Sequence, residues 1–328
     1  MVGVQIVQVC CGGNSTGAVS SEGVFYAWGY NKYGQCGSLT EAAPSNCTDG
    51  ITEPNPVKIP SRSPIIFAAM GQAYTMVVTK DLQLFSCGSN EYGQLGRPDM
   101  KAGDENCNSF EMKPVEMAGM GEVSQICCGR HHTVALTKSK AVYVWGRSDN
   151  GRLGLGRIKE NFRLPRLLPF PVDHSGKAPK ISRIITGDGT NFALTETGRV
   201  YSWGINKYGQ CGYFPPTGRN SNSDACQTTP RLLEHIRGVN NISIGGCSAG
   251  FTIYIVSGLR QILHQHIRDF NISEVRRIVN MAVPVLLSRK PPFQFVVFDN
   301  IKYSLFWIIR KRRRRNGRHP HCCQLGCF

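Results

Sequence analysis

The sequence predicts an all-β chain of stacked four-stranded units, a β-propeller of four blades and a partial fifth. The first observation is a glycine that recurs every 58 or 59 residues. These anchor glycines are Gly12, Gly71, Gly129, Gly187 and Gly245. The second is a box with the same period, which reads AWGYNKYGQCG at residues 27–37. A fixed period of this size is typical of supersecondary units that bury their apolar faces only by stacking on one another.

The third repeat shows how each unit divides into strands. Short apolar runs lie at His132–Thr137 and at residues 141–145, 166–170 and 181–185, and each is bounded by Gly, Pro, Asn or Lys. Runs of this length with such boundaries indicate strands rather than helices. Four strands per repeat are typical of a propeller blade. No helical periodicity precedes residue 259, so we expect little helix in the repeat region.

The box recurs at residues 86–96, 144–154 and 202–212. We predict structural roles for its glycines and tryptophans. These residues are Trp28, Gly29, Gly34, Gly88, Gly93, Trp145, Gly146, Gly151, Trp203, Gly204 and Gly209. The second glycine of each box is expected at positive φ, which glycine adopts at little cost. Cys87 replaces tryptophan in the second box, so the second blade is expected to pack less tightly.

These repeats resemble those of the regulator of chromosome condensation family. The family pattern runs from a G-x-x-H-T segment, here at residues 129–133, to W-G and then N-x-Y-G-Q, here at residues 31–35, 90–94 and 206–210. The resemblance covers about residues 4–258. It implies a propeller with a protein-binding or regulatory role and, in some relatives, guanine-nucleotide exchange on the small GTPase Ran at chromatin.

The chain departs from the family in its number of repeats. The family usually closes a ring of seven blades, whereas this sequence has four boxes and a half unit near residues 241–256. We therefore expect an incomplete ring from a truncated member. A faulty gene model, or partner chains that complete the ring, are the alternatives.

Charge divides the chain into a repeat region, residues 1–258, and a basic tail, residues 259–328. The formal net charge is +16. The tail holds 14 Lys and Arg against 3 Asp and Glu, or +11, and the repeats hold 24 against 19, or +5. Apolar spacing predicts helix in the first part of the tail and disorder beyond it.

The tail carries a run of six cations, Arg310, Lys311, Arg312, Arg313, Arg314 and Arg315. It is interpreted first as a nuclear localisation signal or a contact to nucleic-acid phosphate. A second interpretation is a membrane-surface signal that pairs the run with residues 306–309 and an acylated Cys322 or Cys323. A third is a solvated tail with no binding role.

The sequence contains no catalytic pattern, so we predict a protein that is not an enzyme, with no catalytic, cofactor-binding or metal-ligating residue. Cys47, Cys107 and Cys226 follow three of the boxes and could gather on one face, but ordinary loop thiols are the preferred interpretation. His131 and His132 share no chemistry with their equivalents in other repeats, so a structural role is expected. The longest uncharged stretch, residues 238–259, is rich in Asn, Gly and Ser, so no membrane span is predicted.

The predicted function is an interaction module. Its partner would be a protein, with a small GTPase as one candidate, and nucleic acid could bind through the tail. The candidate contact surface is formed by the long polar inserts after the boxes, residues 38–56, 97–114 and 213–230. Without a basic signal-peptide start, a nuclear or cytoplasmic location is expected rather than secretion. The further alternative is an accessory domain of a larger enzyme.

Overall fold

The computed structural model describes residues 3–37, 50–99, 107–117, 119–207, 209–213, 226–234, 236–244, 252–256 and 294–297. Blade one contains β1 (Ile6–Cys11), β2 (Ser15–Ser20), β3 (Phe25–Gly29) and β4 (Ile51–Pro56). Blade two contains β5 (Ile65–Met70), β6 (Tyr74–Thr79), β7 (Leu84–Ser89) and β8 (Asn108–Pro114). Blade three contains β9 (Val123–Cys128), β10 (His132–Thr137), β11 (Val142–Gly146) and β12 (Phe162–Leu167). Blade four contains β13 (Ile181–Thr186), β14 (Thr190–Thr195), β15 (Val200–Ile205) and β16 (Cys226–Leu232).

Each blade is an antiparallel meander whose strands pair in chain order. The predicted four blades are confirmed, and the one helical segment among the described residues is the short 3₁₀ turn η1 (Asp149–Gly151). The partial fifth sheet contains β17 (Val239–Ile244), β18 (Thr252–Val256) and β19 (Gln294–Val297). Strand β19 comes from the tail and lies parallel to β18, which the sequence analysis did not predict. The predicted tail helix and the basic run lie outside the described residues.

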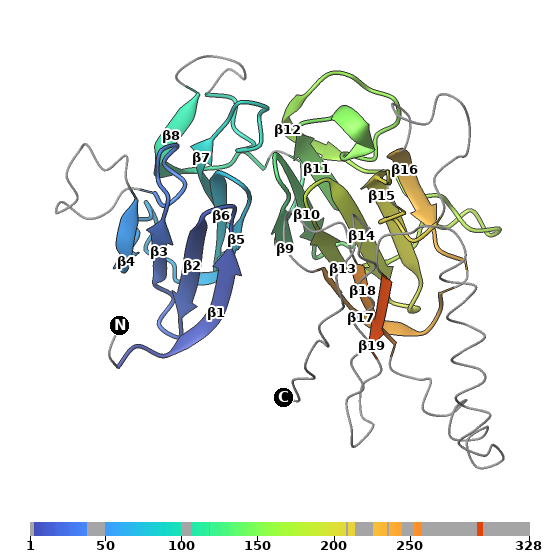
Figure 1. Cartoon of the computed structure of the whole chain (residues 1–328), viewed down its shortest axis with the longest axis horizontal. Helices are drawn as coiled ribbons and strands as arrows, with labels where there is room; N and C mark the ends of the chain where they lie inside the picture. Colours follow the sequence, from blue (N-terminus) through green and yellow to red (C-terminus); the bar gives the residue numbers. More distant parts are fainter. Residues whose placement is uncertain are drawn as a thin grey trace, which may run out of the picture.

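The blades follow one another in chain order across the molecule (Figure 1). The first strand of each blade is the inner one, because β1 lies beside β5, β5 beside β9 and β9 beside β13. Two glutamines join these inner strands. The Gln8 side-chain amide bonds both the N–H and the carbonyl of Ala68, at 2.9 and 2.8 Å. Gln125 makes the same pair of bonds with Ile184, at 3.0 and 2.8 Å.

The hydrophobic core lies between blades rather than within them. Trp145 is fully buried against blade two, and its indole N–H donates to the carbonyl of Gln94 at 2.9 Å. The hydroxyl of Thr133 donates to the same oxygen at 3.0 Å. Blade three therefore attaches to the carbonyl of the box in blade two, and contacts of this kind explain why a period rather than a single motif specifies the fold.

The second box accommodates its missing tryptophan. Cys87 is fully buried, and Thr75 donates its hydroxyl to the carbonyl of Gln35 at 2.5 Å, as Thr133 does one blade on. Met112 belongs to the same core cluster and approaches Gly37 together with the Cys87 thiol. The methionine therefore shares the position that an indole ring takes elsewhere.

Candidate interaction face

One end of every blade carries the features that vary between repeats. We call it the box face. At this end of each blade, the first strand ends at the anchor glycine and the second strand begins. The third strand also ends here, and the rest of the box follows it. The three inserts named above also leave from this end. Residues 38–49, 100–106 and 214–225 within them, including Cys47, lie outside the described part of the chain. The described ends of the three inserts that form the predicted contact surface therefore lie at the box face.

Close backbone approach explains the first two anchor glycines, Gly12 and Gly71. A Cβ atom on Gly12 would lie 2.5 Å from the carbonyl oxygen of Gly71, and one on Gly71 would lie 2.6 Å from that of Gly129. Contacts this short exclude any side chain. The residue after each anchor is thereby held beside its counterpart in the next blade, and the Arg130 N–H donates to the carbonyl of Asp188 at 3.0 Å.

The boxes themselves turn through left-handed glycines. Gly34, Gly93, Gly151 and Gly209 have φ angles of 80°, 83°, 70° and 82°. This is the positive φ that the repeat pattern predicts, and it lets each box fold back over the end of its blade.

A pocket of about 670 Å³ opens on the box face and is shared by all four blades. Blade one contributes Tyr30, Tyr33 and Gln35, blade two Gln72 and Glu91, blade three Arg130 and His131, and blade four Asp188. Most of these residues come directly after an anchor glycine or lie within a box. The pocket therefore forms only when neighbouring blades stack.

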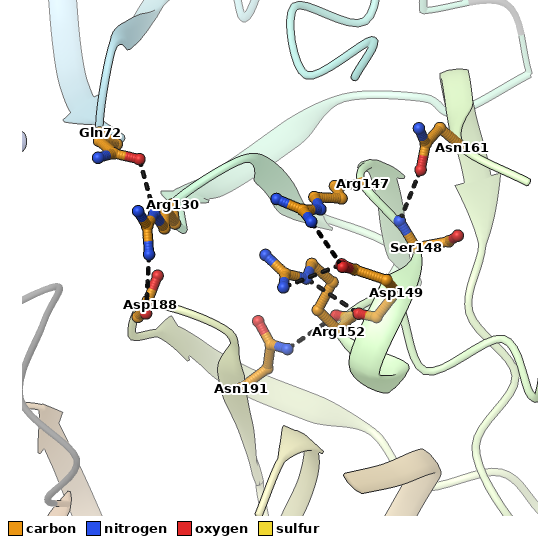
Figure 2. Close-up of polar contacts among 9 residues, drawn as sticks. All are labelled: Gln72, Arg130, Arg147, Ser148, Asp149, Arg152, Asn161, Asp188 and Asn191. Atoms are coloured by element: carbon orange, nitrogen blue, oxygen red, sulfur yellow. Dashed lines mark hydrogen bonds and ion pairs between the residues drawn. The ribbon is translucent and has the colours of Figure 1, made fainter. Parts of the chain in front are cut away.

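Arg130 is positioned by residues of the two adjacent blades (Figure 2). Its Nε donates to the side-chain oxygen of Gln72 at 2.7 Å. One terminal nitrogen lies 3.9 Å from a carboxylate oxygen of Asp188, a long ion pair at a half-exposed site. Exposed pairs of this length contribute little stability. The guanidinium is thus oriented by a hydrogen bond and remains accessible from solvent.

A second charged cluster surrounds η1 (Figure 2). The carboxylate of Asp149 accepts from Arg147 at 2.7 Å and from Arg152 at 2.9 Å. Arg152 stands where the other boxes have glutamine and is almost fully buried. The Arg147 guanidinium lies 4.5 Å from the ring centre of Tyr92, whose ring is 4.9 Å from that of His131. The Arg147 cation and the rings of Tyr92 and His131 therefore lie in a row beside the pocket, with the two rings tilted by 50° to each other.

The pKa of His131 depends on the charges in this part of the box face. Burial, together with the positive charges of Arg147, Arg130 and Arg152, lowers the pKa of His131 from 6.5 to about 4. The negative charge of Asp149 opposes this shift. The imidazole is consequently neutral at physiological pH, and the surroundings on the blade-three side of the pocket are net positive.

Gln35 presents an unpaired donor at the pocket. Its side-chain oxygen accepts from the N–H of Tyr33 at 3.1 Å, as that of Gln94 accepts from Tyr92 at 2.9 Å in the next blade. The amide nitrogen of Gln94 reaches the hydroxyl of Ser89 at 3.4 Å. In blade one Tyr30 replaces that serine, and the Gln35 amide nitrogen is buried without a hydrogen-bond partner among the described residues.

The remaining candidate residues fall in several places. Cys107 is buried and Cys226 is half-buried, and the described residues contain no group of three side chains that could hold a metal ion. His132 is fully buried between blades, whereas His131 lines the pocket. Sequence reasoning missed Gln35 and Arg130 as pocket residues. The signal that could have located the charged cluster was the change of box three to SDNGR.

No helix in the part of the chain that the structure describes is long and apolar enough to span a membrane.

Comparisons with known proteins agree on the repeat. The Regulator of chromosome condensation (RCC1) repeat matches residues 22–78, 83–136, 141–194 and 197–255. Each match begins near the third strand of one blade and ends near the second strand of the next, so the sequence repeat is offset from the structural blade.

Two curated relatives illustrate the range of the repeat. The chain is 34% identical over 247 residues to mouse E3 ubiquitin-protein ligase HERC2, covering 74% of this chain and 4% of the ligase. It is 32% identical to the Arabidopsis thaliana Ultraviolet-B receptor UVR8, covering 64% of this chain and 44% of the receptor. The chain thus spans less than half the length of either relative.

Two solved structures share the fold. Human WBSCR16 matches with a TM-score of 0.62 at 24% identity, covering 74% of this chain and 56% of that one. Prp20p from Saccharomyces cerevisiae matches with a TM-score of 0.59 at 21% identity, covering 75% and 55%.

Proposed function

The chain belongs to the regulator of chromosome condensation (RCC1) repeat family, and we propose that it is a non-catalytic interaction module that binds a protein partner through the box face. One observation carries the proposal. The positions that join blades keep the same contacts, as Thr75 and Thr133 do. The pocket residue that follows each anchor glycine instead differs in every blade, and these residues are Gly13, Gln72, Arg130 and Asp188. A rigid scaffold with variable polar loops is the usual design of a recognition surface.

Variants at the two ends of blade three test this proposal. The full-length chain would be immobilised and offered a purified partner, with Arg130→Gln and Arg147→Gln changed together on the box face. The control pair is Lys138→Gln and Lys140→Gln, which removes two cations from the turn between β10 and β11 at the opposite end. We expect at least tenfold weaker binding for the first pair only, because truncated interface arginines are frequent hot spots. Equal effects from both pairs would contradict the proposal.

Guanine-nucleotide exchange on a Ran-like small GTPase is the finer candidate within this function. It is supported by the family membership and by the fold shared with Prp20p, whose structural report describes its binding properties to Gsp1p and histones. Exchange needs only preferential binding to the nucleotide-free GTPase. Release of fluorescent GDP from Ran, measured with and without the chain, tests it. No acceleration at micromolar concentrations would remove exchange and leave the interaction module.

Two alternative functions concern the basic tail and a larger enzyme. The tail residues Arg310–Arg315 could direct the protein to the nucleus or bind nucleic acid, in which case binding would weaken steeply with salt. The second alternative is that these repeats are an accessory domain of a larger enzyme. It is supported by the match to HERC2, in which the matched region is 4% of a much longer ligase. Under either alternative, the proposed location of the protein is the nucleus or the cytoplasm.

A further inference from the structure

We propose that the pocket on the box face binds an arginine side chain of a protein partner, with its guanidinium over the ring of Tyr33 and paired with Glu91. The inference rests on the proposed function, because it names the chemistry that the box face recognises. Its basis is a difference between two junctions of the same chain. The junction of blades two and three holds an arginine, and the equivalent position at the junction of blades one and two holds a serine.

Arg147 occupies the junction of blades two and three. Its guanidinium lies 4.5 Å from the ring centre of Tyr92, which belongs to the box of blade two. It also donates to the carboxylate of Asp149 at 2.7 Å (Figure 2). His131 packs on the same tyrosine, with the ring centres 4.9 Å apart. A tyrosine of one blade and a carboxylate of the next therefore hold one guanidinium between them.

The junction of blades one and two has the same frame with smaller side chains. In the repeat register, Tyr33 takes the place of the tyrosine and Glu91 takes the place of the carboxylate. Ser89 and Ala73 take the places of the arginine and the histidine. All four residues line the pocket. The pocket therefore extends over the position that the next junction fills with two large side chains of its own.

This frame lacks a cation. In the part of the chain that the structure describes, no cation lies over the Tyr33 ring and no ion pair reaches Glu91. The Tyr92 hydroxyl donates to Glu91, which raises the pKa of the tyrosine, and a carboxylate can accept further hydrogen bonds. The other charged lining residues, Arg130 and Asp188, lie 3.9 Å apart and offset each other. Glu91 therefore gives the lining a net negative charge, which favours a cation over phosphate or carboxylate.

The frame suits arginine in particular. A planar guanidinium stacks on aromatic rings and pairs with a carboxylate through two N–H groups. Tyr30 packs near Tyr33, with ring centres 6.2 Å apart, and extends the aromatic wall of the pocket. The methylene groups of an arginine can lie along such a wall while the charged end reaches Glu91. A protein segment that presents arginine therefore matches both the wall and the carboxylate.

Fluorescence anisotropy with the full chain tests the proposal. The probe is a short fluorescein-labelled peptide that alternates arginine with glycine. Its comparator replaces every arginine with citrulline, which has nearly the same shape without the charge. We expect the arginine probe to bind at least fivefold more tightly, because only the guanidinium can pair with Glu91. Equal binding of the two peptides would overturn the proposal.

Glu91 has a matched control at the opposite end of the blades. Glu91→Gln removes the charge and keeps the shape, and Glu22→Gln makes the same change in the exposed turn between β2 and β3. Only Glu91→Gln should weaken binding of the arginine probe, by about fivefold, because both variants alter the net charge equally. Unchanged binding by Glu91→Gln, or an equal loss in the two variants, would overturn the proposal.

Ser89→Arg supplies the missing cation from the chain itself, as Arg147 does at the next junction. This variant should lose the preference for the arginine probe over the citrulline comparator, since its own guanidinium then lies over Tyr33 and pairs with Glu91. Thermal unfolding checks that the variant folds. A folded variant that keeps the preference would overturn the proposal, and Glu91→Gln carries the test if Ser89→Arg does not fold.

Two outcomes separate this inference from the proposed function. If Arg130→Gln with Arg147→Gln loses the purified partner while the arginine probe never binds, the ligand class is wrong and the interaction face stands. If the probe binds and depends on Glu91, while Glu91→Gln and the paired arginine variants keep the partner, the pocket is real and the interaction face is wrong. Free arginine that displaces the probe as well as unlabelled peptide does would overturn the protein segment in favour of a small guanidinium ligand.

Discussion

The imidazole Nε2 of His132 in blade three lies 2.7 Å from the side-chain oxygen of Asn191 in blade four. Because that oxygen can only accept, Nε2 carries the hydrogen. The amide nitrogen of Asn191 in turn donates to the carbonyl of Arg152 in the box of blade three, at 2.8 Å. The hydroxyl of Tyr74 in blade two donates to the backbone carbonyl of His132. Three blades are therefore joined through one buried polar chain.

The buried hydrogen bonds around His132 predict that the free energy of unfolding depends on pH. Burial, followed by the charge of Arg152, lowers the pKa of His132 from 6.5 to about 3. Below pH 6.5 the unfolded chain binds a proton at this residue that the folded chain does not, so stability falls as the pH drops from 6.5 towards 3. One such proton contributes about 1.4 kcal/mol per pH unit within that window.

His132→Gln isolates this contribution, because glutamine can donate to Asn191 but does not titrate. The variant is expected to be less stable than the parent at pH 7 and to lose less stability between pH 6.5 and pH 4. Urea unfolding at several pH values measures both. Parallel stability–pH curves for parent and variant would show that His132 is not the titrating group.

The tryptophans of the first and third boxes should differ in their cost of removal. Trp145 is fully buried and bonded to Gln94, whereas Trp28 is only partly buried. Trp145→Ala should destabilise the protein by about 3–5 kcal/mol, the usual cost of deleting a buried aromatic ring. Trp28→Ala should cost clearly less, since less apolar area returns to water. Equal losses in denaturant unfolding would mean that Trp28 is covered in solution.

Two box glycines separate backbone strain from steric clash. Gly34 and Gly209 have φ angles of 80° and 82°. A Cβ atom on Gly34 would lie 2.7 Å from the backbone of Phe110 in blade two, whereas one on Gly209 would approach no described residue more closely than 3.6 Å. Gly209→Ala should cost about 1–2 kcal/mol from strain alone. Gly34→Ala should cost more, because blade two must move. Thermal unfolding of the two variants gives the comparison, and a larger loss for Gly209→Ala would contradict it.

The basic run is expected to act collectively. Six adjacent cations cannot be buried without matching anions, so each should add a similar electrostatic attraction to an acidic receptor or to phosphate. Changing Arg312, Arg313, Arg314 and Arg315 together to alanine should shift a tagged protein towards the cytoplasm and flatten any salt dependence of DNA binding. Single changes should do little. Imaging that shows the same distribution for the quadruple variant would leave the tail without an addressing role.

The sequence alone determined the architecture, because the same pattern of strands and turns occurs in every repeat. A glycine every 58 or 59 residues and a recurring box located four blades and predicted the left-handed turns at Gly34 and its equivalents. Those features depend on local backbone conformation and on stacking that every blade repeats, so each copy of the motif reinforces the same interpretation.

Only the tertiary structure decided which side chains meet at the box face. Gln35 and Arg130 are separated by little more than one and a half repeats, and each lies in the pocket because the inner strands of successive blades pack side by side. The unpaired donor of Gln35 arises because Tyr30 replaces the serine that satisfies Gln94. Strand β19 joins the fifth sheet from a tail without repeat pattern. Such contacts depend on distances between segments far apart in the chain, which no local pattern encodes.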